Sequence, residues 1–364
     1  MKTILVTSVG SLVGQNILDS LENRRQNLRI VGTNSDASAW GNFRCETAYL
    51  VRPAADRTAF AKDLSSVIER EAPDVIIPGR DDDIELLGRL RDRLYPDSGA
   101  FLCGHSDFAA VMADKVRSWH FARDKALPFA PTVETGLPDS LRDALSLGNQ
   151  YGFPLIAKPR YGNGTRGVRL VVNADQLQRV AGLHDYAIQP FIGDKPECEL
   201  DTSCGLPFFW EVPEQALFVA QILIGRDASV LDTCLYQLIM VMGRCEGMTL
   251  IKDPRLLAVA HQYADAAIQA GWIGILNVQM KKRSDQTYTA IEMNGRFSGS
   301  TSGRRFFGFD EVRIMLNAWL GESFIPPHPG SISRSIVRQF IDIPVPDSDI
   351  STLKAHGVWQ KSGA

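Results

Sequence analysis

Several features that mark particular classes of protein are missing from this sequence of 364 residues. Its six cysteines include no pair at the CxxC spacing and its histidines no HxxxH pair, which argues against a zinc site or a disulfide framework. No uncharged apolar run reaches the roughly 18 residues of a membrane-spanning helix. The apolar start of the chain is too short for a signal peptide. We therefore expect a cytoplasmic protein that makes no contact with a membrane.

Basic and acidic residues are also nearly balanced. The 39 Lys and Arg residues face 42 Asp and Glu residues, for a formal net charge of −3. A nucleic-acid-binding domain usually carries a basic excess, so no nucleic-acid partner is expected. Internal repeats and low-complexity segments are also missing, while the 45% hydrophobic and 22% charged residues are typical of a globular protein. The length favours two or three domains.

The first hundred residues alternate short apolar runs with helical patterns. Strands are predicted at 4–6, 29–33, 48–51, 74–78 and 100–103. Such alternation favours a parallel sheet that is covered on both faces. After about residue 112 the pattern changes to a helix over 114–125, two strands around a glycine-rich loop, and then mostly strands, two of them at 272–280 and 287–296.

The glycine-rich loop is the first segment whose residues suggest chemistry. It follows Lys158 and contains Gly162, Gly164 and Gly167. Glycines let backbone N–H groups approach an anion closely, and the Lys158 ammonium can bind a phosphate. The segment is not a P-loop, because no GK[ST] closes it and a strand follows. A surface hairpin with solvated charges is an equally good interpretation of this segment alone.

A second hairpin carries acidic and amide side chains. Glu292, Asn294 and Arg296 alternate along the end of a strand and so point to one face. A two-residue loop at 285–286 would place Gln279 of the preceding strand directly opposite Glu292. Gln279, Glu292 and Asn294 would then offer only oxygen ligands, which suits Mg²⁺. Arg296 could bind a transferring phosphoryl group through two hydrogen bonds, and the alternative is a solvated edge strand.

Taken in order, these motifs resemble those of the ATP-grasp superfamily, and the resemblance covers most of the chain. A glutamine such as Gln279 in place of an acid is similar to the carbamoyl-phosphate-synthetase-like branch of carboxylate–amine ligases. The resemblance implies an α/β fold in three parts. These are a Rossmann-like pre-ATP-grasp domain at 1–112, a lid subdomain at 113–190 and a C-terminal subdomain with the metal site at 191–364.

The resemblance also implies roles for individual residues. Arg296 and Lys158 would be catalytic, and Gln279, Glu292 and Asn294 would hold the metal. The residues implied in ATP binding are Lys115, Lys158, Gly162, Gly164, Thr165, Gly167, Gln189, Phe191, Ile192 and Glu197. The sequence departs from the family pattern at Gly295, where proline is common, and at Gln189, where an acid is usual.

The implied activity is that of a ligase that uses ATP and Mg²⁺ (or Mn²⁺). It would convert a small-molecule carboxylate to an acyl phosphate and join it to an amine, releasing ADP and phosphate. Arg304, in a loop rich in Ser and Gly, and Arg226 are candidates for binding the substrate carboxylate, with solvated surface arginines as the alternative. Asp81, Asp82 and Asp83 are expected only to favour the start of a helix. A homodimer is the default expectation.

Three other functions stay open from the sequence. An NAD(P)-dependent oxidoreductase would use the turn at 8–14 and Asp36, although Gly10 and Gly14 do not form a G-x-G-x-x-G motif. A carbamoyl-phosphate-forming enzyme and a non-catalytic nucleotide-binding module could both be built on the ATP-grasp fold.

Overall fold

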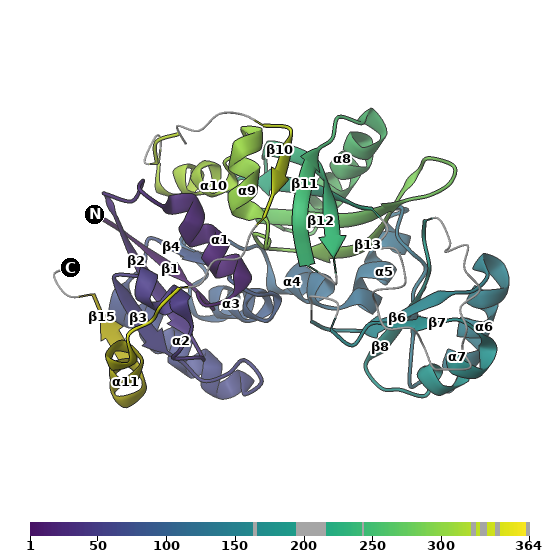
Figure 1. The fold of residues 1–364 in the computed structure, drawn as a ribbon, viewed down its shortest axis with the longest axis horizontal. Coiled ribbons are helices and arrows are strands. Elements are labelled where there is room, and N and C mark those ends of the chain that lie inside the picture. The colour runs from purple at the N-terminus through teal and green to yellow at the C-terminus, as the bar shows by residue number, and fades with distance from the viewer. Residues whose placement is uncertain are drawn as a thin grey trace.

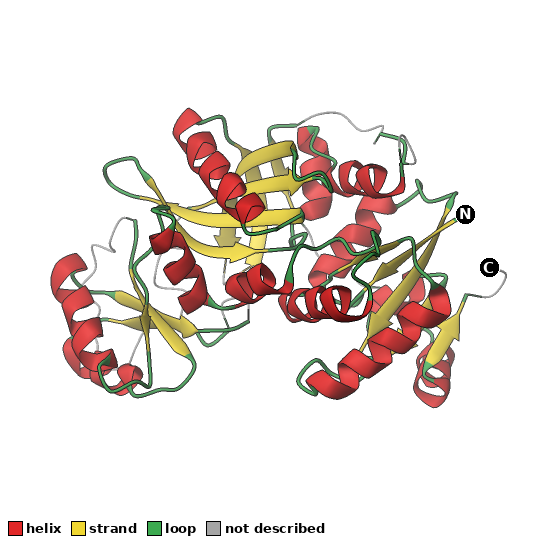
Figure 2. Ribbon diagram, turned by 180° about the vertical axis from the view of Figure 1, so that it is seen from behind, coloured by secondary structure: helices red, strands yellow, loops and turns green. Residues whose placement is uncertain are grey.

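The computed structural model describes residues 1–162, 166–193, 216–241, 244–321, 325–327, 333–338 and 343–361. Within these residues the chain forms three β-sheets with helices packed beside them (Figures 1 and 2). The sheet near the chain termini and the sheet built from residues 133–190 lie at opposite ends of the molecule, with a six-stranded sheet between them (Figure 1).

The first sheet has the strand order β15-β3-β2-β1-β4. Its strands are β1 (Lys2–Val6), β2 (Leu28–Asn34), β3 (Thr47–Leu50), β4 (Val75–Ile77) and β15 (Val358–Gln360). The first four run parallel, as the strand–helix alternation predicts, and β15 pairs antiparallel with β3. The prediction of a strand at 100–103 is wrong. This segment forms only a single bridge, between Ile76 and Phe101, because it leaves the sheet edge after two hydrogen bonds.

Helices cover both faces of this sheet because its buried side chains alternate. Ile4 and Val6 cluster with α1 (Leu12–Leu21), whereas Leu5 clusters with α2 (Arg57–Glu71) and α3 (Asp81–Leu94). The Ser11 side chain accepts the amide of Gly14 and so caps α1. A short 3₁₀ helix, η1 (Trp40–Arg44), separates β2 from β3.

The second sheet is antiparallel and has the order β5-β8-β6-β7. Its elements are β5 (Val133–Glu134), α6 (Ser140–Tyr151), β6 (Leu155–Pro159), β7 (Arg169–Val171), α7 (Ala174–Ala181) and β8 (Tyr186–Pro190). Leu155, Ala157 and Ile188 form a small core with residues of α6 and α7. The sheet therefore has a hydrophobic core of its own.

The six-stranded sheet has the order β13-β12-β9-β10-β11-β14, and all of its strand pairs are antiparallel. Its elements are β9 (Leu217–Ile224), β10 (Val230–Val241), β11 (Arg244–Leu250), α8 (Pro254–Gln269), β12 (Gly274–Lys282), β13 (Tyr288–Asn294), α9 (Thr301–Arg304), η2 (Arg305–Phe307), α10 (Glu311–Leu320) and β14 (Ser335–Val337). Strand β9 is buried throughout, since α8 covers one face of the sheet and α10 the other.

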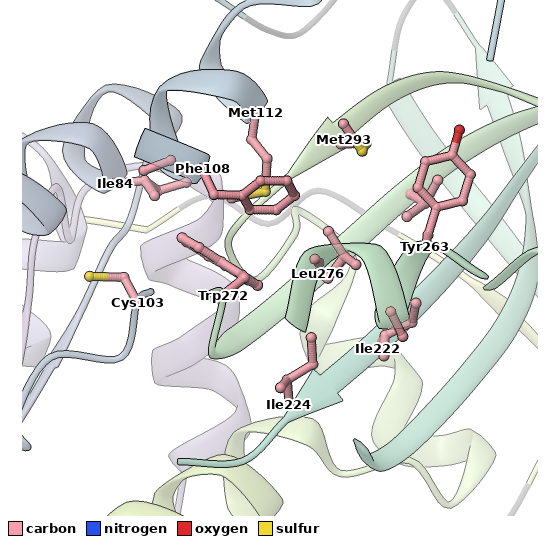
Figure 3. Packing of buried hydrophobic residues seen from close by; sticks show 14 of the residues in the cluster. Ile84, Cys103, Phe108, Met112, Ile222, Ile224, Tyr263, Trp272, Leu276 and Met293 are labelled. Atoms are coloured by element: carbon pink, nitrogen blue, oxygen red, sulfur yellow. The ribbon is translucent and has the colours of Figure 1, made fainter. Parts of the chain in front are cut away.

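Two consecutive helices, α4 (Ser106–Ala113) and α5 (Lys115–Asp124), follow the first sheet and pack against β13. Trp272 is fully buried where α4 meets the six-stranded sheet (Figure 3). Its ring lies 5.9 Å from that of Phe108, and Met112 and Met293 belong to the same cluster. This apolar contact holds α4 and the following start of α5 at a fixed place beside β13.

The C-terminal segment returns to the first sheet (Figure 1). Helix α11 (Asp347–His356) precedes β15. Leu353 and Trp359 pack around Phe43 of η1, with the Trp359 and Phe43 rings 5.3 Å apart in an edge-to-face arrangement. Elsewhere in the fold, none of the helices in the described part of the chain is long and apolar enough to cross a membrane.

Candidate functional site

The β12–β13 hairpin places its polar side chains as predicted, but by a different route. The predicted two-residue loop is wrong: Arg283 bonds to Thr287, so three residues form the loop. This shifts the register by one residue, and Met280 pairs with Ala290. A β-bulge at Ile291 then restores it, and Gln279 pairs with Glu292. Gln279 and Glu292 therefore share one face of the sheet with the pair two residues further along, Asn277 and Asn294.

Glu292 and Asn294 meet a carboxylate from helix α3, which follows the first sheet. With its amide nitrogen facing them, Asn294 lies 3.3 Å from Oε1 of Glu292 and 3.0 Å from Oδ1 of Asp81. Asp81 belongs to the first turn of α3, directly after β4. Gln279 and Glu292 are half-buried and Asn294 is buried. In the opposite orientation the Asn294 oxygen would face the same carboxylates, and amide and carboxylate oxygens of this kind fit a magnesium ion, which prefers hard oxygen ligands and retains water.

The part of the chain that the structure describes contains no cluster of three His, Cys, Asp or Glu side chains that could hold a metal ion. The donors that meet at the end of β13 are instead a mixture of amides and carboxylates. The sequence predicts Glu292 and Asn294 of this group but not Asp81, and a metal-binding role for Gln279, Glu292 and Asn294 stays a prediction.

Arg296 lies next to this group and is almost completely buried. Its Nη2 atom donates to Oδ2 of Asp81 over 2.7 Å, and its Nη1 atom donates to the carbonyl of Phe297 over 3.0 Å. Burial alone would lower the pKa of Arg296, but the charges of Asp81 and Glu292 outweigh it and raise the pKa. The guanidinium is therefore a fixed positive charge beside Glu292.

Lys158 connects the second sheet to the same hairpin. It lies on β6, and its Nζ atom donates to the carbonyl of Ile291 over 3.0 Å, the residue that the β-bulge leaves unpaired. Burial lowers the pKa of Lys158 to about 7; Glu292 opposes this shift, and Lys115 and Lys281 reinforce it. The structure thus brings Lys158 and Glu292 together although 133 residues separate Lys158 from Ile291.

Lys115 begins α5 and is also buried. Its Nζ atom donates to the carbonyl of Gly162 in the glycine-rich loop over 2.9 Å. Gly162 and Gly167 have φ angles of 85° and 74°, which favour glycine. A Cβ atom on Gly167 would approach Pro159 to 2.9 Å. Two further predicted loop residues, Gly164 and Thr165, lie outside the described residues, as does Glu197.

Of the predicted hinge residues, Gln189 lies in β8 of the second sheet, and Phe191 and Ile192 follow that strand. The buried Gln189 side chain donates to Thr132, so its side chain is directed away from solvent, in line with a hinge that acts through its backbone. Phe191 and Ile192 come directly after β8 and are half-buried. Both lie on the segment that leads out of the second sheet.

The two candidate substrate arginines lie in different surroundings. Arg304 is completely buried: its guanidinium pairs with Glu311 and donates to Tyr236 over 2.7 Å. Arg226 follows the end of β9 and bonds to Gly99, seven residues beyond Val219, the partner of Gln279. The extended part of that separation, from Val219 to Ile224 at the end of β9, alone spans about 17 Å. The role of both residues in substrate binding stays a prediction.

Sequence reasoning missed two contributors to this region. Asp81 is in the first turn of α3, as expected, but its ion pair with Arg296 was not foreseen. A signal existed, since Asp81 follows β4, the neighbour of β1 at the point where the strand order of the parallel sheet reverses, and ligands bind at such points. The second contributor is Arg160, which binds both carboxylate oxygens of Asp114 at 2.8 and 2.7 Å and so fixes the start of α5 beside Lys115.

Residues 114–189 match the family model described as the ATP-binding domain of the carbamoyl-phosphate synthase L chain. Mitochondrial pyruvate carboxylase of Rattus norvegicus is 29% identical over 157 residues, which cover 41% of this chain and 13% of that protein. The carbamoyl phosphate synthase large chain of Campylobacter jejuni is 25% identical over 245 residues, covering 65% and 20%. The chain thus matches only a small part of these longer relatives.

Solved structures are similar over almost the whole chain. N5-carboxyaminoimidazole synthetase from Staphylococcus aureus, complexed with ADP, has a TM-score of 0.69 and 13% identity, and the match covers 97% of this chain and 85% of that one. The biotin carboxylase domain of Hydrogenobacter thermophilus 2-oxoglutarate carboxylase, in complex with MgADP and bicarbonate, has a TM-score of 0.65 and 17% identity, with coverages of 91% and 71%. At these identities the likeness shows a shared fold.

Proposed function

We propose that the chain is a member of the ATP-grasp superfamily, and that it is an ATP- and Mg²⁺-dependent ligase that activates a carboxylate and transfers the acyl group to an amine. The observation that carries the proposal is the convergence of the two hairpins. Lys158 of the glycine-rich hairpin binds the backbone next to Glu292, and Arg296 lies beside the same carboxylate. Positive groups and metal-binding oxygens thus meet at one place, as phosphoryl transfer requires.

ATP would bind between the second and the six-stranded sheets. Lys115 and Lys158 would bind its phosphates, and the glycine-rich loop with Gly162, Gly164, Thr165 and Gly167 would close over them. The adenine would lie against the backbone at 189–192, with Glu197 on the ribose. Lys115 and Lys158 are both buried and both face backbone carbonyls, which leaves ammonium hydrogens for phosphate oxygens.

Gln279, Glu292 and Asn294 would hold the magnesium ion, which neutralises charge on the phosphates when bound. Arg296 would orient and stabilise the phosphoryl group as it is transferred. A substrate carboxylate oxygen attacks the γ-phosphorus, and the bond from that phosphorus to the β,γ-bridging oxygen breaks, giving an acyl phosphate and ADP. The amine nitrogen then attacks the acyl carbon, phosphate leaves, and the amine releases a proton.

A second candidate is a carboxylation, in which bicarbonate is the acid that is phosphorylated. It is favoured by the similarity to pyruvate carboxylase and to a carboxylase domain whose structure contains bicarbonate. The two candidates share the same phosphoryl-transfer site and differ in the acid. That domain is described as a dimer, and a homodimer of this chain, testable by light scattering, remains part of the proposal.

The first experiment is calorimetric titration with the non-hydrolysable analogue AMPPNP, with and without Mg²⁺, beside NADH. We expect Mg²⁺-dependent AMPPNP binding and no heat from NADH. ADP release is then measured with bicarbonate and with pools of organic acids, each with and without amines. Binding of NADH without AMPPNP would move the function to the first sheet and overturn the proposal.

A further inference from the structure

The ion pair between Asp81 and Arg296 joins two parts of the molecule that are distant in sequence. Asp81 begins α3 after the first sheet, and Arg296 follows β13 of the six-stranded sheet. Their side chains are 14% and 7% exposed, and the paired atoms are 2.7 Å apart. The contact is therefore a largely desolvated charge pair, in which each group strongly affects the position of the other.

Arg296 nevertheless keeps hydrogen-bonding capacity. Its Nε atom is buried and has no hydrogen-bond partner among the residues that the structure describes. A buried donor without a partner is costly, and several other arginines in the structure also have one, so the place of Arg296 beside Glu292 is what favours a ligand there. A phosphate oxygen is the acceptor that fits, because a guanidinium presents its N–H groups as a planar fork.

The surroundings of the pair favour an exchange of partners. Asp81 also lies 3.0 Å from the Asn294 amide, which in turn faces Glu292. An incoming terminal phosphate would add negative charge next to the two carboxylates, Asp81 and Glu292. Glu292 would be compensated by magnesium when it serves as a metal ligand, whereas Asp81 would compete with the phosphate for the same guanidinium.

We propose that Asp81 is the positioning residue for Arg296: it holds the guanidinium in place in the nucleotide-free protein and gives it up to the terminal phosphate of ATP. This inference rests on the proposed function. Because Asp81 lies in the first turn of α3, directly after β4 of the first sheet, the exchange would also loosen the contact between α3 and the end of the β12–β13 hairpin when ATP, but not ADP, is bound.

The test compares Asp81→Asn with Asp82→Asn. Asp82 lies in the same helical turn and is exposed, so its substitution removes the same charge from the same helix end without touching the pair. We expect D81N to bind MgAMPPNP about five- to tenfold more tightly than the wild type, because a competing charge is lost. MgADP affinity should not change, and D82N should match the wild type. In an Arg296→Gln background the effect of D81N should be clearly smaller, because only the direct repulsion between Asp81 and the phosphate remains to be relieved.

A measurement on the wild type covers the case in which D81N does not fold. Hydrogen exchange of the peptide that spans the first turns of α3 should be faster with MgAMPPNP than with MgADP. Equal hydrogen exchange with the two nucleotides, equal affinities of D81N and D82N, or an effect of D81N that is undiminished without Arg296 would each overturn the inference alone. Failure of the wild type to bind any nucleotide would overturn the proposed function, and the inference with it.

Discussion

Raising the pH from 6 to 8.5 should weaken nucleotide binding, because Lys158 loses its proton in this range. Burial lowers the pKa of this amine from 10.5 to about 7, while Glu292 opposes the shift and Lys115 and Lys281 reinforce it. Phosphates beside the amine would favour the ammonium form and raise its pKa again. Binding of ATP above pH 7 must therefore be accompanied by uptake of a proton.

The expected size follows from the pKa. With a pKa of about 7, Lys158 is roughly one-tenth protonated at pH 8 and nine-tenths protonated at pH 6. Binding should then take up about 0.9 protons at pH 8 and about 0.1 at pH 6, and affinity should fall roughly tenfold per pH unit above 7. For unfolding the sign is opposite. The unfolded chain binds this proton between pH 7 and 10.5 while the folded protein does not, so stability rises with pH there.

Proton uptake is measured by calorimetric titration of MgAMPPNP in buffers of different ionisation enthalpy. The Lys158→Arg and Lys158→Met variants provide the controls, since neither side chain titrates in this range. Uptake should disappear in both. Equal uptake at pH 6 and pH 8 in the wild type, or uptake that survives in both variants, would refute the assignment of a low pKa to Lys158.

Three further predictions concern other parts of the site. Glu292→Gln should reduce the rate of ADP release at least about a hundredfold and raise the Mg²⁺ concentration that the protein requires. Asp285→Asn, at the far end of the same hairpin, should change neither, and equal activities of the two variants would contradict the assignment of Glu292 as a metal ligand. Glu311→Gln should lower the free energy of unfolding in urea by about 3 kcal/mol, because it leaves the buried Arg304 charge unpaired. An unchanged unfolding midpoint would show that other groups neutralise the Arg304 charge. Gly167→Ala should weaken MgAMPPNP binding severalfold through strain at φ 74° with a close contact to Pro159, and wild-type affinity would remove this glycine from the nucleotide site.

The β12–β13 hairpin shows how far alternation along a strand can be trusted. Period-two alternation near Glu292 predicts the face of each side chain correctly, because the local geometry of β13 determines it. The predicted loop was one residue too short, and the bulge at Ile291 was not predicted. The two errors cancel, so the pairing of Gln279 with Glu292 was predicted correctly from an incorrect loop. Bulges depend on contacts such as that from Lys158, which are distant in sequence.

Contacts between sheets account for what the sequence did not reveal. The sequence shows Asp81 only as one of three acids at the start of a helix, and its ion pair with Arg296, 215 residues away, gives it a second role. Arg304 reads as a free arginine in a polar loop, yet Glu311, seven residues later, neutralises it in the core. The segment at 100–103 is apolar enough for a strand, but whether it pairs depends on the course of the chain at the sheet edge.

Strand β15 has a consequence for the order in which the chain folds. It completes the first sheet by covering β3, which would otherwise be an exposed edge that invites pairing with other chains. About 280 residues separate the end of β4 from β15, so a ribosome would need roughly 15–60 s to supply the missing strand. During synthesis the edge of β3 therefore stays unpaired until β15 has been made, and deletion of residues 343–361 should leave that edge exposed in the finished protein.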